Sequence, residues 1–243
     1  MKIYEALKLS ERERMAPAFC QKAVVATDRT ALEREGLRQK LLTVHRMIES
    51  ALPNLPCRVI GLVGASGGEG TSTLARELAK IATTNFGRRV GLIDMSSGTA
   101  SHHQHFGVPP GTCLGDMLKR DMPVLDALPT VPDYAGLYLG KLGDGLGSPS
   151  TETVEITLSK ALNSLREHFD LILLDLLPFH ESSDALVVAR ESDGIIITVE
   201  AEKTRWPVVH NLKEKLIMQG ANVLGVILNK RRFHIPSAIY RRL

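Results

Sequence analysis

After Arg58 the sequence is built from short apolar runs that are continuous rather than alternating. Strands with one wet face alternate apolar and polar residues, whereas strands buried on both faces read as unbroken apolar runs. Amphipathic segments of helical periodicity separate the runs, and this repetition is typical of parallel strands joined by helices. We therefore predict an α/β fold: a three-layer, doubly wound, mostly parallel sheet with helices on both faces. The predicted strands are 58–64, 89–95, 137–142, 170–176, 194–200 and 223–229, and the predicted helices are 71–85, 113–120, 151–168, 182–192 and 207–219.

The residues before Arg58 predict two helices. An amphipathic helix over 1–15 is followed by a linker over 16–28, and a second helix runs from about residue 30 to Leu52 with Asp28 as its N-cap. We expect three parts: an N-terminal helix and linker (1–28), one α/β domain (29–232) and a C-terminal tail (233–243). Segments 96–112 and 129–150 are predicted loops because glycine, serine and proline gather there.

Composition excludes several classes of protein. The 243 residues are 44% hydrophobic and 23% charged, which is typical of a folded globular chain rather than a disordered one. The sequence contains no apolar run near the roughly 20 residues that a membrane helix requires. The first residues carry acids and lack the apolar core of a secretory signal. Three widely separated cysteines (Cys20, Cys57 and Cys113) suit neither a disulfide framework nor zinc spacing, so we expect a reducing cytoplasm.

The C-terminal tail carries a local positive charge. The net charge of the whole chain is only +3, but five basic residues and no acidic one lie between Lys230 and Leu243. Such a patch suits nucleic acid, anionic lipid, an acidic protein surface, or plain solvation. Apolar residues between the charges also suit a docking peptide, a lipid anchor or a helix folded back on the domain. The sequence leaves these alternatives open.

A glycine-rich segment follows the first predicted strand of the domain and opens a helix. Gly67, Gly68 and Gly70 allow backbone N–H groups to point inward, as in an anion-binding nest at a helix N-terminus. A phosphate loop of the Walker type has this context and then Gly-Lys-Ser/Thr. Thr71 stands where that lysine is expected, and Ser72 follows with the hydroxyl that would ligate magnesium. The alternatives are a loop that still binds phosphate and a plain tight turn between strand and helix.

The effect of the missing lysine on nucleotide affinity can be predicted. A charge-assisted hydrogen bond to phosphate is worth about 1.5–3 kcal/mol, which is roughly ten- to a hundredfold in affinity. The lysine also offsets charge that develops during phosphoryl transfer. We therefore expect catalysis to suffer more than binding.

Two later strands end in aspartate. Asp94 closes the strand at 89–95 and Asp175 closes the strand at 170–176. An aspartate at the carboxyl end of a parallel strand beside a phosphate loop usually holds magnesium, directly or through water. Either residue alone could also cap a loop. Together with the glycine loop they predict a nucleotide site in which Asp94 and Asp175 do the catalytic work.

In its order of motifs, the chain resembles the P-loop domain of bacterial tyrosine kinases, which are relatives of the MinD/ParA ATPases. The resemblance rests on GASGGEGTSTLARELA, VGLIDMSSG, TCLGDML, GLYLGKLGDGLGSP, LILLDLLP, DALVVARESDGIIITVEAEKTRW and VLGVILNK, and covers about residues 30–232. It implies ATP or ADP with Mg²⁺ as ligand, bound by Gly67, Gly68, Glu69, Gly70, Thr71, Ser72 and Thr73. It also implies a base contact at Asn229, and Mg²⁺ at Ser72, Asp94 and Asp175.

The same resemblance implies partners. Glu35 and Arg38 match the first two-thirds of a Glu-x-x-Arg-x-x-Arg element through which the family packs into rings, and Leu41 replaces its second arginine. The family's cytoplasmic domains act with integral-membrane polysaccharide co-polymerases. A homo-oligomer and a peripheral place at the inner membrane are therefore expected, and nucleic acid is not favoured as a partner.

The departures from the family pattern lie mainly in the motifs that bind nucleotide and carry out phosphoryl transfer. The Walker lysine is Thr71, and the Asp-x-Asp-x-Arg element reads Asp94-Met-Ser96-Ser-Gly98. The third motif, usually Asp-Thr-Pro-Pro, reads Asp175-Leu-Leu-Pro. Tyr240 stands alone in place of a cluster of phosphoacceptor tyrosines. This pattern indicates a degenerate Walker site in a pseudokinase, or a chain that binds no nucleotide at all.

A histidine cluster follows the second motif. His102, His103 and His105 lie in a predicted loop, and consecutive loop histidines are expected to be solvated at the surface. Their nearness to the site also raises the hypothesis that they replace the lost cationic contacts to phosphate. Arg76, Lys203 and an arginine of a neighbouring chain are further candidates for that substitution.

The resulting hypothesis is a cytoplasmic, kinase-like P-loop protein of exopolysaccharide biosynthesis or export that is catalytically impaired and acts with a membrane co-polymerase. Two alternatives remain. One is an active ATP-dependent tyrosine autokinase in which another base replaces the lysine. The other is a positioning ATPase of the MinD/ParA type that uses its basic tail on lipid or DNA.

Overall fold

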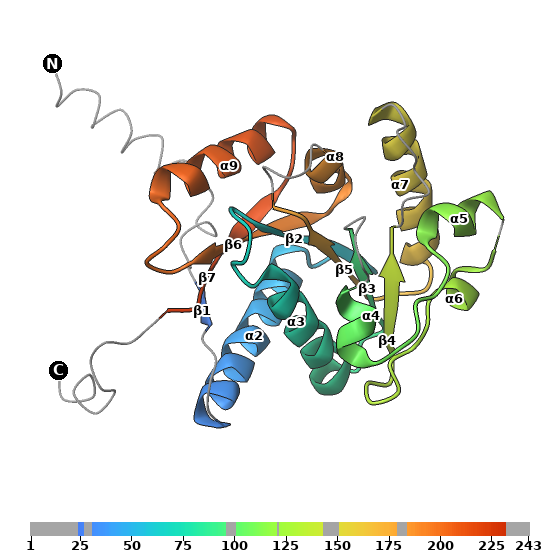
Figure 1. Cartoon of the computed structure of the whole chain (residues 1–243), viewed down its shortest axis with the longest axis horizontal. Helices are drawn as coiled ribbons and strands as arrows, with labels where there is room; N and C mark the ends of the chain where they lie inside the picture. The colour runs from blue at the N-terminus through green and yellow to red at the C-terminus, as the bar shows by residue number, and fades with distance from the viewer. Residues whose placement is uncertain are drawn as a thin grey trace, which may run out of the picture.

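The core of the protein is one seven-stranded sheet in which every strand pair is parallel (Figure 1). The computed structural model describes residues 24–26, 31–95, 101–120, 122–142, 151–178 and 184–231. The strand order is β1-β7-β6-β2-β5-β3-β4. The strands are β1 (Val24–Ala26), β2 (Arg58–Gly64), β3 (Val90–Asp94), β4 (Leu137–Lys141), β5 (Leu171–Leu176), β6 (Gly194–Glu200) and β7 (Val223–Asn229).

Helices cover both faces of this sheet, which confirms the predicted fold class (Figure 1). The five helices predicted after Arg58 are present within two residues of their expected bounds, and the helix expected from about residue 30 is α2. They are α2 (Ala31–Ala51), α3 (Thr71–Phe86), α4 (Ser101–Phe106), α5 (Leu114–Lys119), α6 (Val124–Ala127), α7 (Thr151–Arg166), α8 (Asp184–Glu191) and α9 (Trp206–Met218).

Three short elements correct the sequence-based boundaries. The segment expected to be a linker contains β1, which pairs with the outer edge of β7 through Val24–Ala26. The segment expected to be a loop over 96–112 contains α4, and α6 lies just before the second expected loop. Pairing with a strand edge and packing against a sheet decide such short elements, and local sequence does not carry that information. The predicted helix at 1–15 and the tail after Arg231 lie outside the described residues.

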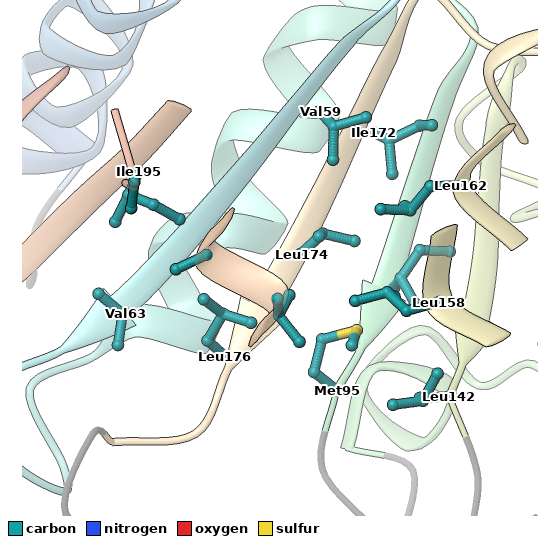
Figure 2. Packing of buried hydrophobic residues seen from close by; sticks show 14 of the residues in the cluster. Val59, Val63, Met95, Leu142, Leu158, Leu162, Ile172, Leu174, Leu176 and Ile195 are labelled. Atoms are coloured by element: carbon teal, nitrogen blue, oxygen red, sulfur yellow. The ribbon is translucent and has the colours of Figure 1, made fainter. Parts of the chain in front are cut away.

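Side chains on successive strand positions divide between two hydrophobic clusters. On β2, Val59 and Val63 join the cluster under α5, α7, α8 and α9, whereas Ile60 and Leu62 join the cluster under α2 and α3. Figure 2 shows the first cluster, with strand residues such as Leu174 facing Leu158 and Leu162 of α7. Burial on both faces explains why the strand sequences are continuously apolar.

The register of the central strands brings three carboxyl ends together. Asp94 at the end of β3 pairs with Asp175 of β5, and Asp175 also pairs with Leu62 of β2. β2 then ends at Gly64, where the glycine loop begins. The loop and both aspartates therefore meet at one edge of the sheet, where open α/β folds bind ligands.

An ion pair ties α7 to the opposite edge of the sheet. Asp193 accepts two hydrogen bonds from Arg166, at 2.9 and 2.8 Å, and a third from the backbone N–H of Val59 at 2.7 Å. The hydrogen bonds to Asp193 raise the pKa of the Arg166 guanidinium. The pair therefore holds the start of β2 against the end of α7.

We expect Arg166→Met to lower the free energy of unfolding by about 1–2 kcal/mol, since charged hydrogen bonds are lost from a partly exposed pair. Urea unfolding of both proteins measures the difference without the screening that a salt would add. The matched control is Arg190→Met, because Arg190 lies 3.9 Å from Glu191 on the surface of α8. That change is expected to cost less than about 0.5 kcal/mol. Equal losses in the two variants would contradict a bracing role for Arg166.

Within the part of the chain that the structure describes, no helix has the length and apolar character that crossing a membrane demands.

Candidate functional site

The glycine loop runs from the end of β2 into α3 and borders a cavity of about 450 Å³. Gly68 and Gly70 have φ angles of 81° and 88°, a left-handed conformation that glycine adopts without a steric penalty. Gly70 also precedes α3 as its N-cap residue, and no side chain caps the helix there. The first N–H groups of α3 therefore remain available for a ligand at the cavity.

Glu69 braces the loop from within. Its side chain is 2% exposed, and its carboxylate accepts hydrogen bonds from the backbone N–H of Ser66 and the hydroxyl of Thr204. Thr204 lies between β6 and α9, so Glu69 ties the loop to the neighbouring strand connection. The resemblance placed Glu69 among the nucleotide-binding residues, and the structure uses its carboxylate to hold the loop in shape.

The end of β7 supplies two further contacts to the loop. The Asn229 side-chain amide donates to the Glu69 carbonyl at 2.8 Å, and a Cβ atom on Gly70 would lie 2.4 Å from that amide nitrogen. Lys230 follows, and its ammonium donates to the carbonyl oxygen of Gly68. The loop is thus held on one side by Glu69 and on the other by Asn229 and Lys230.

The two strand-end aspartates lie together as the sequence predicts. Asp94 and Asp175 are 2% and 5% exposed, and both line the cavity with the hydroxyl-bearing Ser72. Carboxylate and hydroxyl oxygens are the protein ligands that Mg²⁺ prefers. The donor set of Ser72, Asp94 and Asp175 fits Mg²⁺ in kind.

The His102 side chain, from α4, lies against one carboxylate oxygen of Asp175. Its Nε2 lies 3.1 Å from Oδ2 of Asp175, within ion-pair distance, although the contact does not satisfy hydrogen-bond geometry. On its other side, Nη1 of Arg76 lies 3.4 Å from Nδ1 of His102. Arginine can only donate, so Nδ1 is the acceptor and the ring proton lies on Nε2, toward Asp175. His102 thus contacts Asp175 on one side and Arg76 on the other.

The expectation that the histidine cluster is solvated was wrong for two of its three members. His102 is 0% and His103 is 3% exposed, whereas His105 lies at the surface. Burial and the neighbouring His102 lower the pKa of His103, which favours its uncharged form. None of the three histidines lines the cavity, so the structure does not support the hypothesis that they replace the cationic contact to phosphate. The short helix α4, absent from the prediction, buries them beneath the sheet edge.

The structure also places the two bases that the sequence offered as substitutes for the lysine. Arg76 contacts His102 and Thr73, and Lys203 pairs with Glu200 at 3.2 Å in a neighbouring hollow. Neither of them lines the cavity beside the loop. Among the described residues around that cavity, the one cationic side chain is Lys230. Lys230 belongs to the basic stretch at the C-terminus by sequence, but its position directly after the end of β7 is a signal that could have placed it at the site.

The remaining predicted residues lie apart from the cavity or outside the described chain. Glu35 and Arg38 form an exposed pair on α2, with Nη1 and Oε2 3.7 Å apart. Their role in oligomerisation stays a prediction. Tyr240, Ser96 and Gly98 lie outside the described residues.

Comparisons with known proteins identify chains that are similar in sequence. The putative tyrosine-protein kinase CapB of Staphylococcus aureus is 25% identical over 171 residues, which span 70% of this chain and 74% of that protein. The chain is thus similar in sequence to proteins named as bacterial tyrosine-protein kinases. The succinoglycan biosynthesis transport protein ExoP of Rhizobium meliloti is 29% identical over 179 residues, or 71% of this chain and 22% of that protein. No protein-family model matches the sequence.

Several solved structures have the same fold as this chain. The chimerical protein CapA2B2 superposes with a TM-score of 0.74 at 19% identity, covering 93% of this chain and 99% of that one. The kinase domain of the Escherichia coli tyrosine kinase Etk gives 0.72 at 17% identity, with 92% and 88% covered. The septum site-determining protein MinD of Pyrococcus horikoshii, complexed with Mg-ADP, gives 0.58 at 24% identity, with 76% of each chain covered.

Proposed function

We propose that this chain is a kinase-like P-loop protein of exopolysaccharide or capsule biosynthesis that binds ATP or ADP weakly and is impaired in phosphoryl transfer. The observation that carries the proposal is a braced phosphate loop, with free N–H groups at the start of α3, in which Thr71 stands where the Walker lysine belongs. Binding depends mainly on the backbone cradle, which is retained. Transfer depends on charge at the terminal phosphate, which a neutral hydroxyl does not supply.

The aspartate side of the site supports the same proposal. Bound Mg²⁺ would neutralise phosphate charge during transfer, and Ser72 and Asp94 are the residues that would hold it. The Oδ2 atom of Asp175 lies against His102, so this carboxylate is partly committed to an internal contact. A weakened metal position and a missing cation both reduce turnover more than they reduce ligand binding.

The proposed partner is an integral-membrane polysaccharide co-polymerase, and the proposed place is the cytoplasmic side of the inner membrane. This part rests on the resemblance to the tyrosine kinases and on relatives such as ExoP, whose name places it in succinoglycan biosynthesis and transport. Self-assembly through Glu35 and Arg38 is part of the same proposal. Co-sedimentation with liposomes and with DNA separates it from a MinD/ParA-like function, which predicts pelleting with lipid or DNA without a protein partner.

We expect the purified chain, given Mg²⁺ and radiolabelled ATP, to bind nucleotide weakly and to incorporate no phosphate on tyrosine above the background of Asp175→Ala. Phosphoamino-acid analysis after long incubation is the measurement. Strong autophosphorylation on Tyr240 that the Asp175→Ala change abolishes would refute the impairment and establish the active-kinase alternative.

A further inference from the structure

The cavity beside the glycine loop has an unbalanced set of charges. Three acidic side chains, those of Glu69, Asp94 and Asp175, contribute to its lining, together with one ammonium group, that of Lys230, among the described residues. A phosphate chain carries several negative charges and needs cationic donors to bind in such surroundings. If the cavity takes a nucleotide, the cationic side chain that contacts the phosphates must come from a residue other than Thr71.

Lys230 lies along the loop that would hold the phosphates. Its Cε atom is 3.8 Å from the position that a Cβ on Gly70 would take, and its Nζ donates to the carbonyl of Gly68. Asn229, directly before it, is buried against the loop through its bond to Glu69. The lysine side chain therefore reaches the glycine loop from the end of β7 and lines the cavity there.

The ammonium of Lys230 keeps donor capacity for a ligand. An ammonium group has three N–H donors. Two of them are used by the Gly68 carbonyl and by Oε2 of Glu200, which lies 3.2 Å away. The side chain is 46% exposed and the residue lines the cavity, so the third donor is not used by the contacts above and is open to solvent or ligand. Lys203 holds the same Glu200 oxygen at the same distance but lies outside the cavity.

The backbone at Lys230 is also unusual. Its φ angle of 55° is left-handed, which a residue with a side chain adopts at a cost of about 1–2 kcal/mol. Such conformations persist where the surrounding structure enforces them, and they gather at binding sites. The side chain is thus directed onto the loop by a conformation that glycine would adopt more easily.

We propose that Lys230 supplies the cation of this site: its ammonium contacts the phosphate chain of a bound nucleoside di- or triphosphate and substitutes in part for the lysine missing at Thr71. This inference deepens the proposed function and rests on the nucleotide binding in it. Because Lys230 follows β7, its ammonium contacts the ligand but does not lie at the first turn of α3, where the Walker lysine would be. It therefore supports nucleotide binding more than phosphoryl transfer.

The test is calorimetric titration of the full chain with Mg·ADP and with pyrophosphate. We expect Lys230→Met to weaken both affinities about 10- to 100-fold, the effect of one charged hydrogen bond. Lys230→Gly removes the ammonium at a φ angle that glycine tolerates, so it gives the same loss even if the Met variant folds poorly. Lys203→Met is the matched control, since it removes an equivalent bond to Glu200, and its affinity is expected to stay within about threefold of the wild type.

A double-mutant cycle separates contact with the ligand from bracing of the loop. Thr71→Lys is expected to raise the affinity more in the Lys230→Gly background than in the wild type, because two ammonium groups that serve the same phosphate chain are partly redundant. An equal or smaller gain in the Lys230→Gly background makes Lys230 a brace and overturns the inference. Wild-type binding that both Lys230 variants retain overturns it as well and leaves the proposed nucleotide binding intact. A wild type that binds neither Mg·ADP nor pyrophosphate refutes that binding, and the inference falls with it.

Discussion

Replacing Thr71 with lysine is expected to raise the affinity for Mg·ADP about 10- to 100-fold, which is the value of a charge-assisted hydrogen bond to phosphate. Thr71 is the first residue of α3 and lines the cavity together with Ser72 and Asp94. A side chain at this position starts at the N-terminal end of the helix, where the free N–H groups point toward an anion. The added ammonium therefore acts on a ligand that the backbone already orients.

The matched control for that gain is Thr84→Lys. Thr84 is exposed in the last turn of the same helix and does not line the cavity. It adds the same charge to the surface without placing the ammonium inside the cradle, so we expect a change of less than about threefold, as for an exposed ion pair. Calorimetric titration measures both variants. Equal gains at the two positions would show a general electrostatic effect and contradict a preserved cradle.

Gly70→Ala is expected to lower the free energy of unfolding by about 2–3 kcal/mol, because a left-handed alanine costs about 1–2 kcal/mol and a broken hydrogen bond adds about 1 kcal/mol. The φ angle of Gly70 is 88°, and the new Cβ would lie 2.4 Å from the amide nitrogen of Asn229. Asn229 must then move, and its bond to the Glu69 carbonyl is lost. Urea unfolding measures the change.

Gly68→Ala separates the cost of a left-handed alanine from the cost of the broken hydrogen bond. Gly68 has a similar φ angle of 81°, but a Cβ there has no heavy atom within 4 Å. We expect this variant to lose only the conformational part, about 1–2 kcal/mol. If both alanine variants lose the same stability, the contact between Asn229 and the loop contributes nothing measurable.

Local patterns were enough to predict the sheet and its position relative to the glycine loop. Continuous apolar runs mark strands of a sheet that is covered on both faces, and they were correct for β2 through β7 because helices pack on both faces of this sheet. The glycine loop followed from spacing and residue type, and Asp94 and Asp175 followed from their places at strand ends. The structure at these positions depends either on residues that are near in sequence or on the rule that the carboxyl ends of parallel strands meet at one edge of a sheet.

Short elements and long-range contacts did not follow from the sequence. The six residues of α4 are too few to show periodicity, so the burial of His102 and His103 depended on how that helix packs beneath the sheet edge. β1 exists because the edge of β7 was open to a further strand.

The sequence alone determined that this protein is an α/β sheet with a phosphate-type loop lacking its lysine, because periodicity and residue identity are local properties of the chain. The tertiary structure alone decided which charges meet there. Lys230 is separated from Gly68 by 162 positions and His102 from Asp175 by more than 70, and no local pattern encodes such contacts. They arise from strand order, which places β7 near the loop and α4 near β5, and so the surroundings of the missing lysine became visible only in the folded chain.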